Sequence, residues 1–248
     1  MIPKEFEQTL VLIKPDALKN SLTGFVLSLL SEFHTGLRFA GTKIVNVSRM
    51  LAAEHYAEHK GKIFYDSLLE YLTGAIHYPG EPEKQRVISI VYQGVAAVKK
   101  LRDIAGPTNP LVAREQKPGC IRSLGALAPL KNAQGTVIGE RMDNLIHASA
   151  NAADAEREIK LWFRPNDMPP AMHAYATKES NDHFYFKNGQ LLTTHEPGSE
   201  LLVAPGDIVW DTDLDVLINT LKGAKTTTTL EAVAAKYLVN KAIEKTSA

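Results

Sequence analysis

The sequence predicts a small α/β sandwich in which helices cover one face of a sheet. Short apolar segments rich in β-branched residues alternate with segments whose apolar residues recur at helical spacing, in the order strand, helix, strand, helices, strand, helix, strand, helix. The chain contains no Gly-x-Gly and no Gly-Lys-Ser/Thr. We therefore do not expect a Rossmann dinucleotide site or a Walker phosphate loop.

The composition indicates a globular protein, with one large domain or one domain plus an appendage. Its 28 basic and 28 acidic side chains balance, so no overall field favours nucleic acid or an acidic membrane. Cys120 is the only cysteine, which excludes an intrachain disulfide and a multi-cysteine zinc site. The N-terminal residues do not resemble a signal peptide, and no apolar run approaches the roughly 20 residues that span a bilayer. We expect a cytoplasmic protein that has neither a membrane nor nucleic acid as a partner.

The first strand is predicted over Thr9–Ile13 and ends at Pro15, because proline cannot donate a hydrogen bond to a neighbouring strand. Apolar residues at helical spacing over Thr23–Phe33 predict a helix that stops before Gly36. Capping residues and glycines delimit the next elements: a strand over 42–47, a helix over 51–59 capped by Ser48, a helix over 63–72 before Gly74, a strand over 87–92, a helix over 96–104 before Gly106-Pro107, a strand over 145–148 and a helix over 152–163 capped by Asn151.

The composition changes after Arg164. Residues 165–180 are polar and rich in proline, and a hairpin is predicted over Phe184–Leu192 because Asn188-Gly189 favours a tight turn. A helix is predicted over Asp213–Leu221. A final amphipathic helix carries its apolar residues at Leu230, Val233, Ala234, Tyr237, Leu238 and Ile243. We find no catalytic constellation in this part and expect it to bury an apolar face, with an oligomer contact as one option.

Chemically active side chains gather at the ends of the predicted elements. His147 lies on the last strand before the helix that carries Glu158, and an imidazole beside a carboxylate is a nucleophile at neutral pH because its usual pKa is about 6.5. Lys14, Arg102 and Arg122, if directed at this histidine, would suit a polyphosphate, whose transfer requires positioning and charge neutralisation. Taken singly, each residue has a structural explanation, because strand histidines are usually core residues and arginines are usually solvated.

Five motifs in the same order resemble those of the nucleoside diphosphate kinase family. They are Thr9-Leu-Val-Leu-Ile-Lys-Pro-Asp-Ala17, Glu54-His-Tyr-Ala-Glu-His-Lys60, Gly106-Pro-Thr-Asn-Pro110, Lys117-Pro-Gly-Cys-Ile-Arg122, and Asn144-Leu-Ile-His-Ala-Ser149 followed by Ala155-Glu-Arg-Glu-Ile-Lys-Leu-Trp-Phe163. The resemblance implies an α+β fold, a ferredoxin-like sandwich with a four-stranded antiparallel sheet (βαββαβ) and covering helices. It implies a catalytic domain over 1–165, followed by an extension over 166–248 with a hairpin and helices.

The resemblance also implies a reversible ping-pong transfer of the γ-phosphate of a nucleoside triphosphate to a nucleoside diphosphate. His147 would carry the phosphoryl group on Nδ1, held by Glu158 with help from Ser149, and Mg²⁺ would bind the phosphates of the nucleotide rather than a protein ligand. The remaining implied site residues are Arg102, Thr108 and Arg122 at the phosphates, Tyr56 and His59 close by, Lys14 and Asn144 at the sugar hydroxyls with Lys14 also touching phosphate, and Phe64 against the base. Stacking accepts every base, so broad specificity is expected, and family members form homo-oligomers.

The sequence departs from the family pattern at Ala148 and Ala150, which stand where the family has glycine and aspartate. Alanine resists positive φ, and the missing aspartate removes a carboxylate near the metal. Residues 75–86 and 124–142 are insertions and 111–116 is slightly expanded; within the second insertion, 131–136 is expected to form a hairpin tip. The second insertion as a whole is expected close to the nucleotide entrance or an oligomer contact, because both of its ends adjoin predicted site residues. These changes leave an alternative open: a catalytically weakened homologue that binds nucleotide as a regulatory or scaffolding module. The retained nucleophile, acid and phosphate ligands favour the active enzyme.

Overall fold

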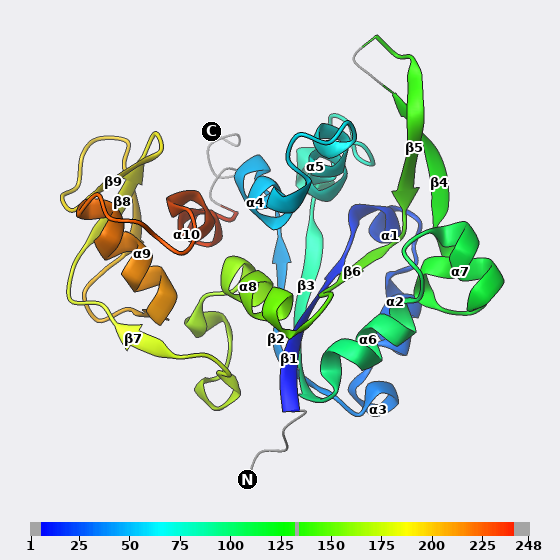
Figure 1. Cartoon of the computed structure of the whole chain (residues 1–248), viewed down its shortest axis with the longest axis horizontal. Helices are drawn as coiled ribbons and strands as arrows, with labels where there is room; N and C mark the ends of the chain where they lie inside the picture. The colour runs from blue at the N-terminus through cyan, green and yellow to red at the C-terminus, as the bar shows by residue number, and fades with distance from the viewer. Residues whose placement is uncertain (1–5, 132–133, 241–248) are drawn as a thin grey trace.

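The computed structural model describes residues 6–131 and 134–240, and its centre is a four-stranded antiparallel sheet in the order β2-β3-β1-β6 (Figure 1). The strands are β1 Phe6–Ile13, β2 Arg38–Val45, β3 Val87–Val95 and β6 Ile146–Ala148. This is the sheet that the ferredoxin-like prediction requires. All four predicted strands are therefore confirmed, although β2 begins and ends earlier than expected.

Helices cover both faces of the sheet, so the prediction of a single covered face is wrong. Leu10 and Leu12 of β1 join one buried cluster with residues of α4, α5 and α8, whereas Val11 and Ile13 join another cluster with residues of α1, α2 and α6. Successive side chains of a strand point to opposite faces, so an uninterrupted apolar run needs cover on both. Figure 1 shows α8 and α6 on either side of β1.

The helices are α1 Pro15–Lys19, α2 Thr23–Leu29, α3 Glu32–Thr35, α4 Arg49–His55, α5 Tyr65–Thr73, α6 Ala97–Ala105, α7 Pro110–Gln116, α8 Ala152–Trp162, α9 Asp211–Leu221 and α10 Leu230–Tyr237. Ser48 and Asn151 cap α4 and α8 as predicted, each accepting a hydrogen bond from a backbone N–H of the first turn. The helix α1 was not predicted; proline occupies its first position, where no backbone hydrogen bond is lost.

Three other helical segments differ from the sequence prediction. The helix expected over 23–33 breaks after Leu29, because Ser31 caps the separate helix α3, and Phe33 is fully exposed. The helix expected over 51–59 ends at His55 and continues as a 3-10 turn over Ala57–His59. The expanded segment 111–116 forms most of α7, whose start is capped by Asn109.

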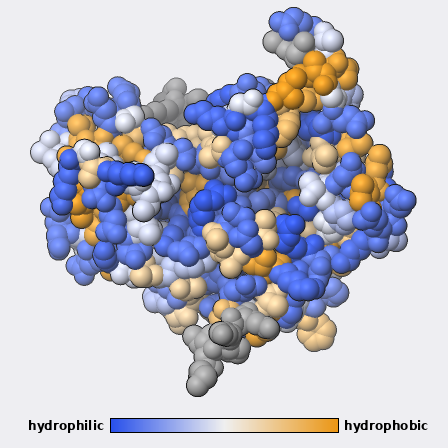
Figure 2. All heavy atoms as spheres, in the orientation of Figure 1, coloured by the Kyte–Doolittle hydropathy of each residue, from blue (hydrophilic) through white to orange (hydrophobic). Residues whose placement is uncertain are grey.

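The insertion over 124–142 forms a protruding hairpin of β4 Ala126–Lys131 and β5 Val137–Asp143 (Figure 1). Residues 132 and 133 of the expected tip lie outside the described residues. Figure 2 shows apolar side chains on this projection, where Val137 and Met142 are exposed. The other insertion, 75–86, contains a 3-10 turn over Pro82–Lys84 and buries His77, whose Nε2 lies 2.9 Å from Asp143 Oδ2 at the end of the hairpin.

The extension contains β7 Thr177–Glu179, β8 Phe184–Lys187, β9 Gln190–Leu192, β10 Glu200–Val203 and β11 Ile208–Trp210, with α9 and α10. The predicted hairpin is confirmed, since Asn188 and Gly189 both adopt positive φ between β8 and β9. Ile243 of the predicted final helix lies outside the described residues. None of the helices in the described ranges has the length and apolar content needed to cross a bilayer.

The extension packs against the rest of the same chain. Helix α10 contributes Ala232 and Ala235 to the core cluster that contains α4 and α8. The indole Nε1 of Trp210 donates a hydrogen bond of 2.7 Å to the carbonyl oxygen of Phe163, just after α8. Part of the apolar face of α10 is therefore buried within the chain itself, beside the helix that carries Glu158.

Candidate active site

A cavity of about 390 Å³ lies where the end of β1 meets β6. Its lining includes these sequence-predicted residues: Lys14, Tyr56, His59, Phe64, Arg102, Thr108, Arg122, Asn144, His147 and Glu158. Ser149 does not line the cavity but contacts Glu158 from behind. The fold thus gathers, around one cavity, residues that are far apart in the sequence.

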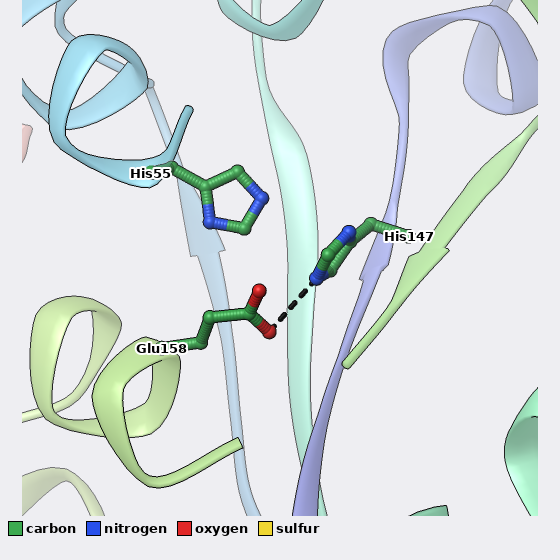
Figure 3. A group of neighbouring side chains, drawn as sticks. All are labelled: His55, His147 and Glu158. Atoms are coloured by element: carbon green, nitrogen blue, oxygen red, sulfur yellow. Dashed lines mark hydrogen bonds and ion pairs between the residues drawn. The ribbon is translucent and has the colours of Figure 1, made fainter. Parts of the chain in front are cut away.

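His147 is fixed by the strand pairing and by a buried carboxylate. It pairs with Leu12 across the β1–β6 ladder, and its Nε2 lies 2.8 Å from Glu158 Oε2 (Figure 3). Ser149 Oγ donates to the same oxygen at 2.6 Å and accepts a 3.1 Å bond from the backbone N–H of Leu10. A carboxylate can only accept a hydrogen bond, so Nε2 carries the hydrogen and the Nδ1 lone pair is available.

Glu158 remains ionised in this setting. Burial alone would raise its pKa, but the nearby His147 and the hydrogen bonds from His147 and Ser149 outweigh burial and lower the pKa to about 2. It stands on the inner face of α8, between the buried residues Ala155 and Trp162. An ionised carboxylate at this position stabilises positive charge on the imidazole.

Basic side chains line the cavity close to His147. Lys14 is buried at the end of β1; burial, partly offset by Asp16, lowers its pKa to about 8, and its ammonium donates to Asn144 Oδ1. Arg122 is buried as well, and its guanidinium donates to the carbonyl oxygens of Gly106 at 2.9 Å and Ile146 at 3.3 Å. These two bonds use two of the five N–H donors of the guanidinium, so donors remain for a ligand.

The turn that leads into β6 is held in an unusual conformation. Leu145 has a φ of 69°, which is rare for a branched residue. Its N–H donates to Asp16 Oδ2 at 2.9 Å, and its carbonyl oxygen accepts from the N–H of Lys14 at 2.9 Å. Asn144 Nδ2 donates to the carbonyl oxygen of Thr108 at 2.9 Å. These bonds connect β1, β6 and the loop before α7 at one edge of the cavity.

Aromatic residues form another part of the lining. The rings of Tyr56 and His59 are stacked with centroids 5.9 Å apart, and His59 meets Phe64 edge-on at 5.7 Å. Phe64 is 38% exposed, so part of its ring is free to stack on a planar ligand. Tyr56 and His59 therefore share a side even though α4 ends at His55, before both of them.

The two family departures have different structural settings. Ala148 is a buried residue of β6 that pairs with Val11, and it is not among the described residues with positive φ. Alanine is therefore unstrained at this position. Ala150 lines the cavity with an apolar methyl group.

The sequence interpretation missed several lining residues. The hairpin insertion contributes Leu130, Glu140, Arg141 and Met142 to the cavity, and α5 contributes Ser67, Leu68 and Tyr71. The hairpin residues lie in the inserted segment, which was expected near the nucleotide entrance or an oligomer contact, but the motifs carry no signal for the individual side chains. His55 was also missed, although it stands beside Tyr56 in a quoted motif; its ring lies edge-on to His147 with centroids 4.5 Å apart.

Comparisons with known proteins agree with this geometry. A family model described as nucleoside diphosphate kinase matches residues 7–168. A nucleoside diphosphate kinase of Pyrococcus furiosus is 36% identical over 186 residues, which cover 75% of this chain and 97% of that protein.

Solved structures show the same fold. The nucleoside-diphosphate kinase of Borrelia burgdorferi, with bound vanadate and ADP, is 30% identical with a TM-score of 0.52, covering 66% of this chain and 91% of that one. The Halobacterium salinarum enzyme in complex with CDP is also 30% identical, with a TM-score of 0.50 and the same coverage. The matched region contains every sequence-predicted site residue. The chain therefore belongs to the nucleoside diphosphate kinase family and is a phosphotransferase.

Proposed function

We propose that the protein transfers the γ-phosphate of a nucleoside triphosphate to a nucleoside diphosphate by a ping-pong route through a phosphohistidine on His147. The observation that carries the proposal is the bond from His147 Nε2 to Glu158, which leaves the Nδ1 lone pair for the cavity. Nδ1 attacks the γ-phosphorus, the bond to the β-phosphate oxygen breaks, and the nucleoside diphosphate leaves. A second nucleoside diphosphate then attacks the same phosphorus, and the bond to Nδ1 breaks.

The residues around His147 would share the work of this transfer. Arg122, Arg102 and Lys14 would bind the phosphates and offset their charge, which is the main requirement of phosphoryl transfer. Glu158 would balance the positive charge that the imidazole acquires when Nδ1 is phosphorylated while Nε2–H is retained. Ser149 would keep the carboxylate in place through its 2.6 Å hydrogen bond.

The nucleoside would occupy the remainder of the cavity. Phe64 would stack on the base, and Asn144 with Lys14 would contact the sugar hydroxyls, while Tyr56, His59 and Thr108 complete the lining. Broad base specificity is supported by the related structures, since the Borrelia enzyme holds ADP and the Halobacterium enzyme holds CDP.

Magnesium fits this site as a companion of the nucleotide. The carboxylate of Glu158 is already engaged by His147 and Ser149, whereas the nearby cations suit phosphate oxygens. Mg²⁺ prefers oxygen ligands and keeps several waters, so phosphate oxygens and water would hold it. When bound, it would supply further neutralisation of phosphate charge.

A catalytically weakened, nucleotide-binding homologue remains the alternative. Ala148 and Ala150, the insertions and the extension are the sequence arguments for it, and the strand conformation of Ala148 removes the backbone strain expected at the first of these. The intact bond between His147 and Glu158 also favours the active enzyme.

Steady-state kinetics test the proposal. With ATP and dTDP varied against each other, a ping-pong route gives parallel lines in double-reciprocal plots. His147→Gln should abolish transfer while ADP still binds with near wild-type affinity, because the phosphate-binding cations remain. Intersecting lines, or transfer retained in the variant, would contradict the phosphohistidine route.

We further propose that the chain works in the cytoplasm as a homo-oligomer. Exposed apolar residues on the hairpin, among them Val137 and Met142, support a contact there, and residues 166–240 offer further surface. The test is the mass of the full chain in solution. A multiple of 27.3 kDa is expected, and a mass of 27.3 kDa itself at working concentration would contradict the assembly.

A further inference from the structure

Two histidines and one carboxylate meet at the base of the active-site cavity. One potential ligand atom from each of His55, His147 and Glu158 lies within 4.8 Å of the other two. Figure 3 shows the edge of the His55 ring turned toward both other side chains. The three residues come from α4, β6 and α8, and no second group of this kind occurs in residues 6–131 and 134–240.

His55 is an unusual residue to find in this place without a ligand. It is 2% exposed, and its Nε2 has no hydrogen-bond partner in the described structure. Its Nδ1 accepts a 3.2 Å bond from the indole N–H of Trp162. Burial first, and then the nearby His147, hold the pKa of His55 well below its usual value, so the ring is neutral. A neutral imidazole is the form that binds metal ions.

We propose that His55, His147 and Glu158 form a binding site for a borderline transition-metal ion such as Zn²⁺, and that its occupation switches the enzyme off. Two imidazole nitrogens and one carboxylate, with a fourth position open to the cavity, make a donor set that suits Zn²⁺. Mg²⁺ prefers an octahedron of oxygens and would not compete well for it. The ion would thus act separately from any Mg²⁺ carried by the nucleotide.

The loss of activity follows from which nitrogen of His147 carries the ring hydrogen. This inhibition, unlike metal binding itself, rests on the proposed function. A metal ion bound to Nε2 of His147 takes the lone pair at that atom, so the ring hydrogen moves to Nδ1. Nδ1 then has no lone pair with which to attack phosphorus. Glu158 is drawn to the metal and no longer accepts from the ring. No proton leaves the neutral ring, so binding requires only this exchange between its two nitrogens.

Metal binding would break a hydrogen bond of Trp162, which opposes binding and gives a measurable change in fluorescence. If the ion binds Nε2 of His55, the hydrogen of that ring moves to Nδ1 and faces the indole N–H of Trp162. The 3.2 Å bond between them is then lost. Metal binding should therefore change the fluorescence of Trp162, measured in a Trp210→Phe background so that Trp162 is the only indole.

The test begins with cobalt alone, without nucleotide. Co²⁺ is titrated into the unphosphorylated full-length protein, and the d–d absorption of four-coordinate cobalt is followed, with Zn²⁺ then added to displace it. We expect one Co²⁺ per chain with the intense bands of a tetrahedral site. His55→Asn removes one ligand while its amide oxygen can still accept from Trp162, and it should lose the bands. The matched control, His195→Gln in the extension, should keep them.

Activity is then measured after the protein is incubated with Zn²⁺ and diluted into excess Mg²⁺ and ATP, each variant against its own metal-free rate. His55→Asn should need at least about tenfold more Zn²⁺ than wild type for half inhibition. Unchanged cobalt bands or unchanged zinc sensitivity in His55→Asn would overturn the proposal, as would an absence of binding to wild type. The cobalt bands need no turnover, so an inactive enzyme that shows them would refute the proposed function while leaving the metal site in place.

Discussion

Replacing Glu158 with glutamine should slow phosphorylation of His147 without preventing nucleotide binding. The substitution keeps the size of the side chain and an oxygen that can accept from Nε2, but it removes the negative charge. The carboxylate now accepts two short bonds, 2.8 Å from His147 and 2.6 Å from Ser149, in a position that is 4% exposed. Hydrogen bonds to a charged group contribute about 1.5–3 kcal/mol.

In the proposed mechanism the bond that matters is the one from His147, because phosphorylation of Nδ1 would give the ring a positive charge. A loss of about 2–3 kcal/mol at that stage corresponds to a roughly 30- to 150-fold slower formation of phosphoenzyme. Ser149→Ala leaves the charge in place and removes one hydrogen bond, so its effect should be smaller, about fivefold to tenfold.

Rapid-quench measurement of phosphoenzyme formation, with ATP at saturation, provides the assay. Glu156→Gln is the matched control, because Glu156 stands on the same helix but is exposed and pairs with Lys160. Its rate should be close to wild type. If Glu158→Gln phosphorylates within threefold of wild type, the carboxylate does not stabilise the charged imidazole and the reasoning is wrong.

Three further predictions follow from the geometry. Burial lowers the pKa of Lys14 to about 8, so raising the pH through 8 removes its positive charge and should lower kcat/KM for ATP. A Lys14→Met variant should not show this fall, and a wild-type pH profile that stays flat would contradict the role of Lys14 at the phosphates. Phe64→Ala should weaken the binding of ATP, GTP and CTP alike, by the ~1–3 kcal/mol that stacking contributes per base, and so raise KM for each. An effect on one base only would refute simple stacking. Asp213→Ala leaves the buried ammonium of Lys236 without its 2.6 Å partner and should lower the free energy of unfolding, measured in urea, by about 3–5 kcal/mol. The double variant Asp213→Leu/Lys236→Met, which leaves no unpaired charge, should lose much less stability.

The fold of the first 165 residues was predictable because its signals are local. The apolar run of β1 and the caps at Ser48 and Asn151 each fix an element without reference to the rest of the chain. The same run also carried the information that both faces of the sheet are covered, which the one-face prediction overlooked. The break after Leu29 was harder to see, because the apolar spacing continues to Phe33 and only the cap at Ser31 marks the new helix.

The candidate site was predictable where motifs mark it, and not where it depends on the insertion. His147 and Glu158 stand in short segments whose residue types indicate their chemistry. The hairpin residues Glu140 and Met142 line the cavity because of how the paired strands β4 and β5 are placed against the rest of the fold, which depends on tertiary packing rather than on a local pattern. His55 was missed for another reason. The adjacent Tyr56 fills the expected role, and the importance of His55 arises from neighbours that are distant in the sequence.

The extension shows how a segment without chemistry can still bear on the active site. Helix α10 lies against α4 and α8, the helices that carry His55 and Glu158. The buried pair of Asp213 and Lys236 then links α10 to α9 within the extension. The described part of the extension, residues 166–240, therefore supports the position of the two helices from behind.

The most direct measurement is a single-turnover mix of the purified protein with γ-labelled ATP, quenched in alkali. We expect label on the protein that survives base, is lost in acid, chases onto added GDP and is absent in His147→Gln. If ADP binds but no label reaches the protein, or if His147→Gln is labelled as well as wild type, His147 does not carry the phosphoryl group and the proposed mechanism is wrong.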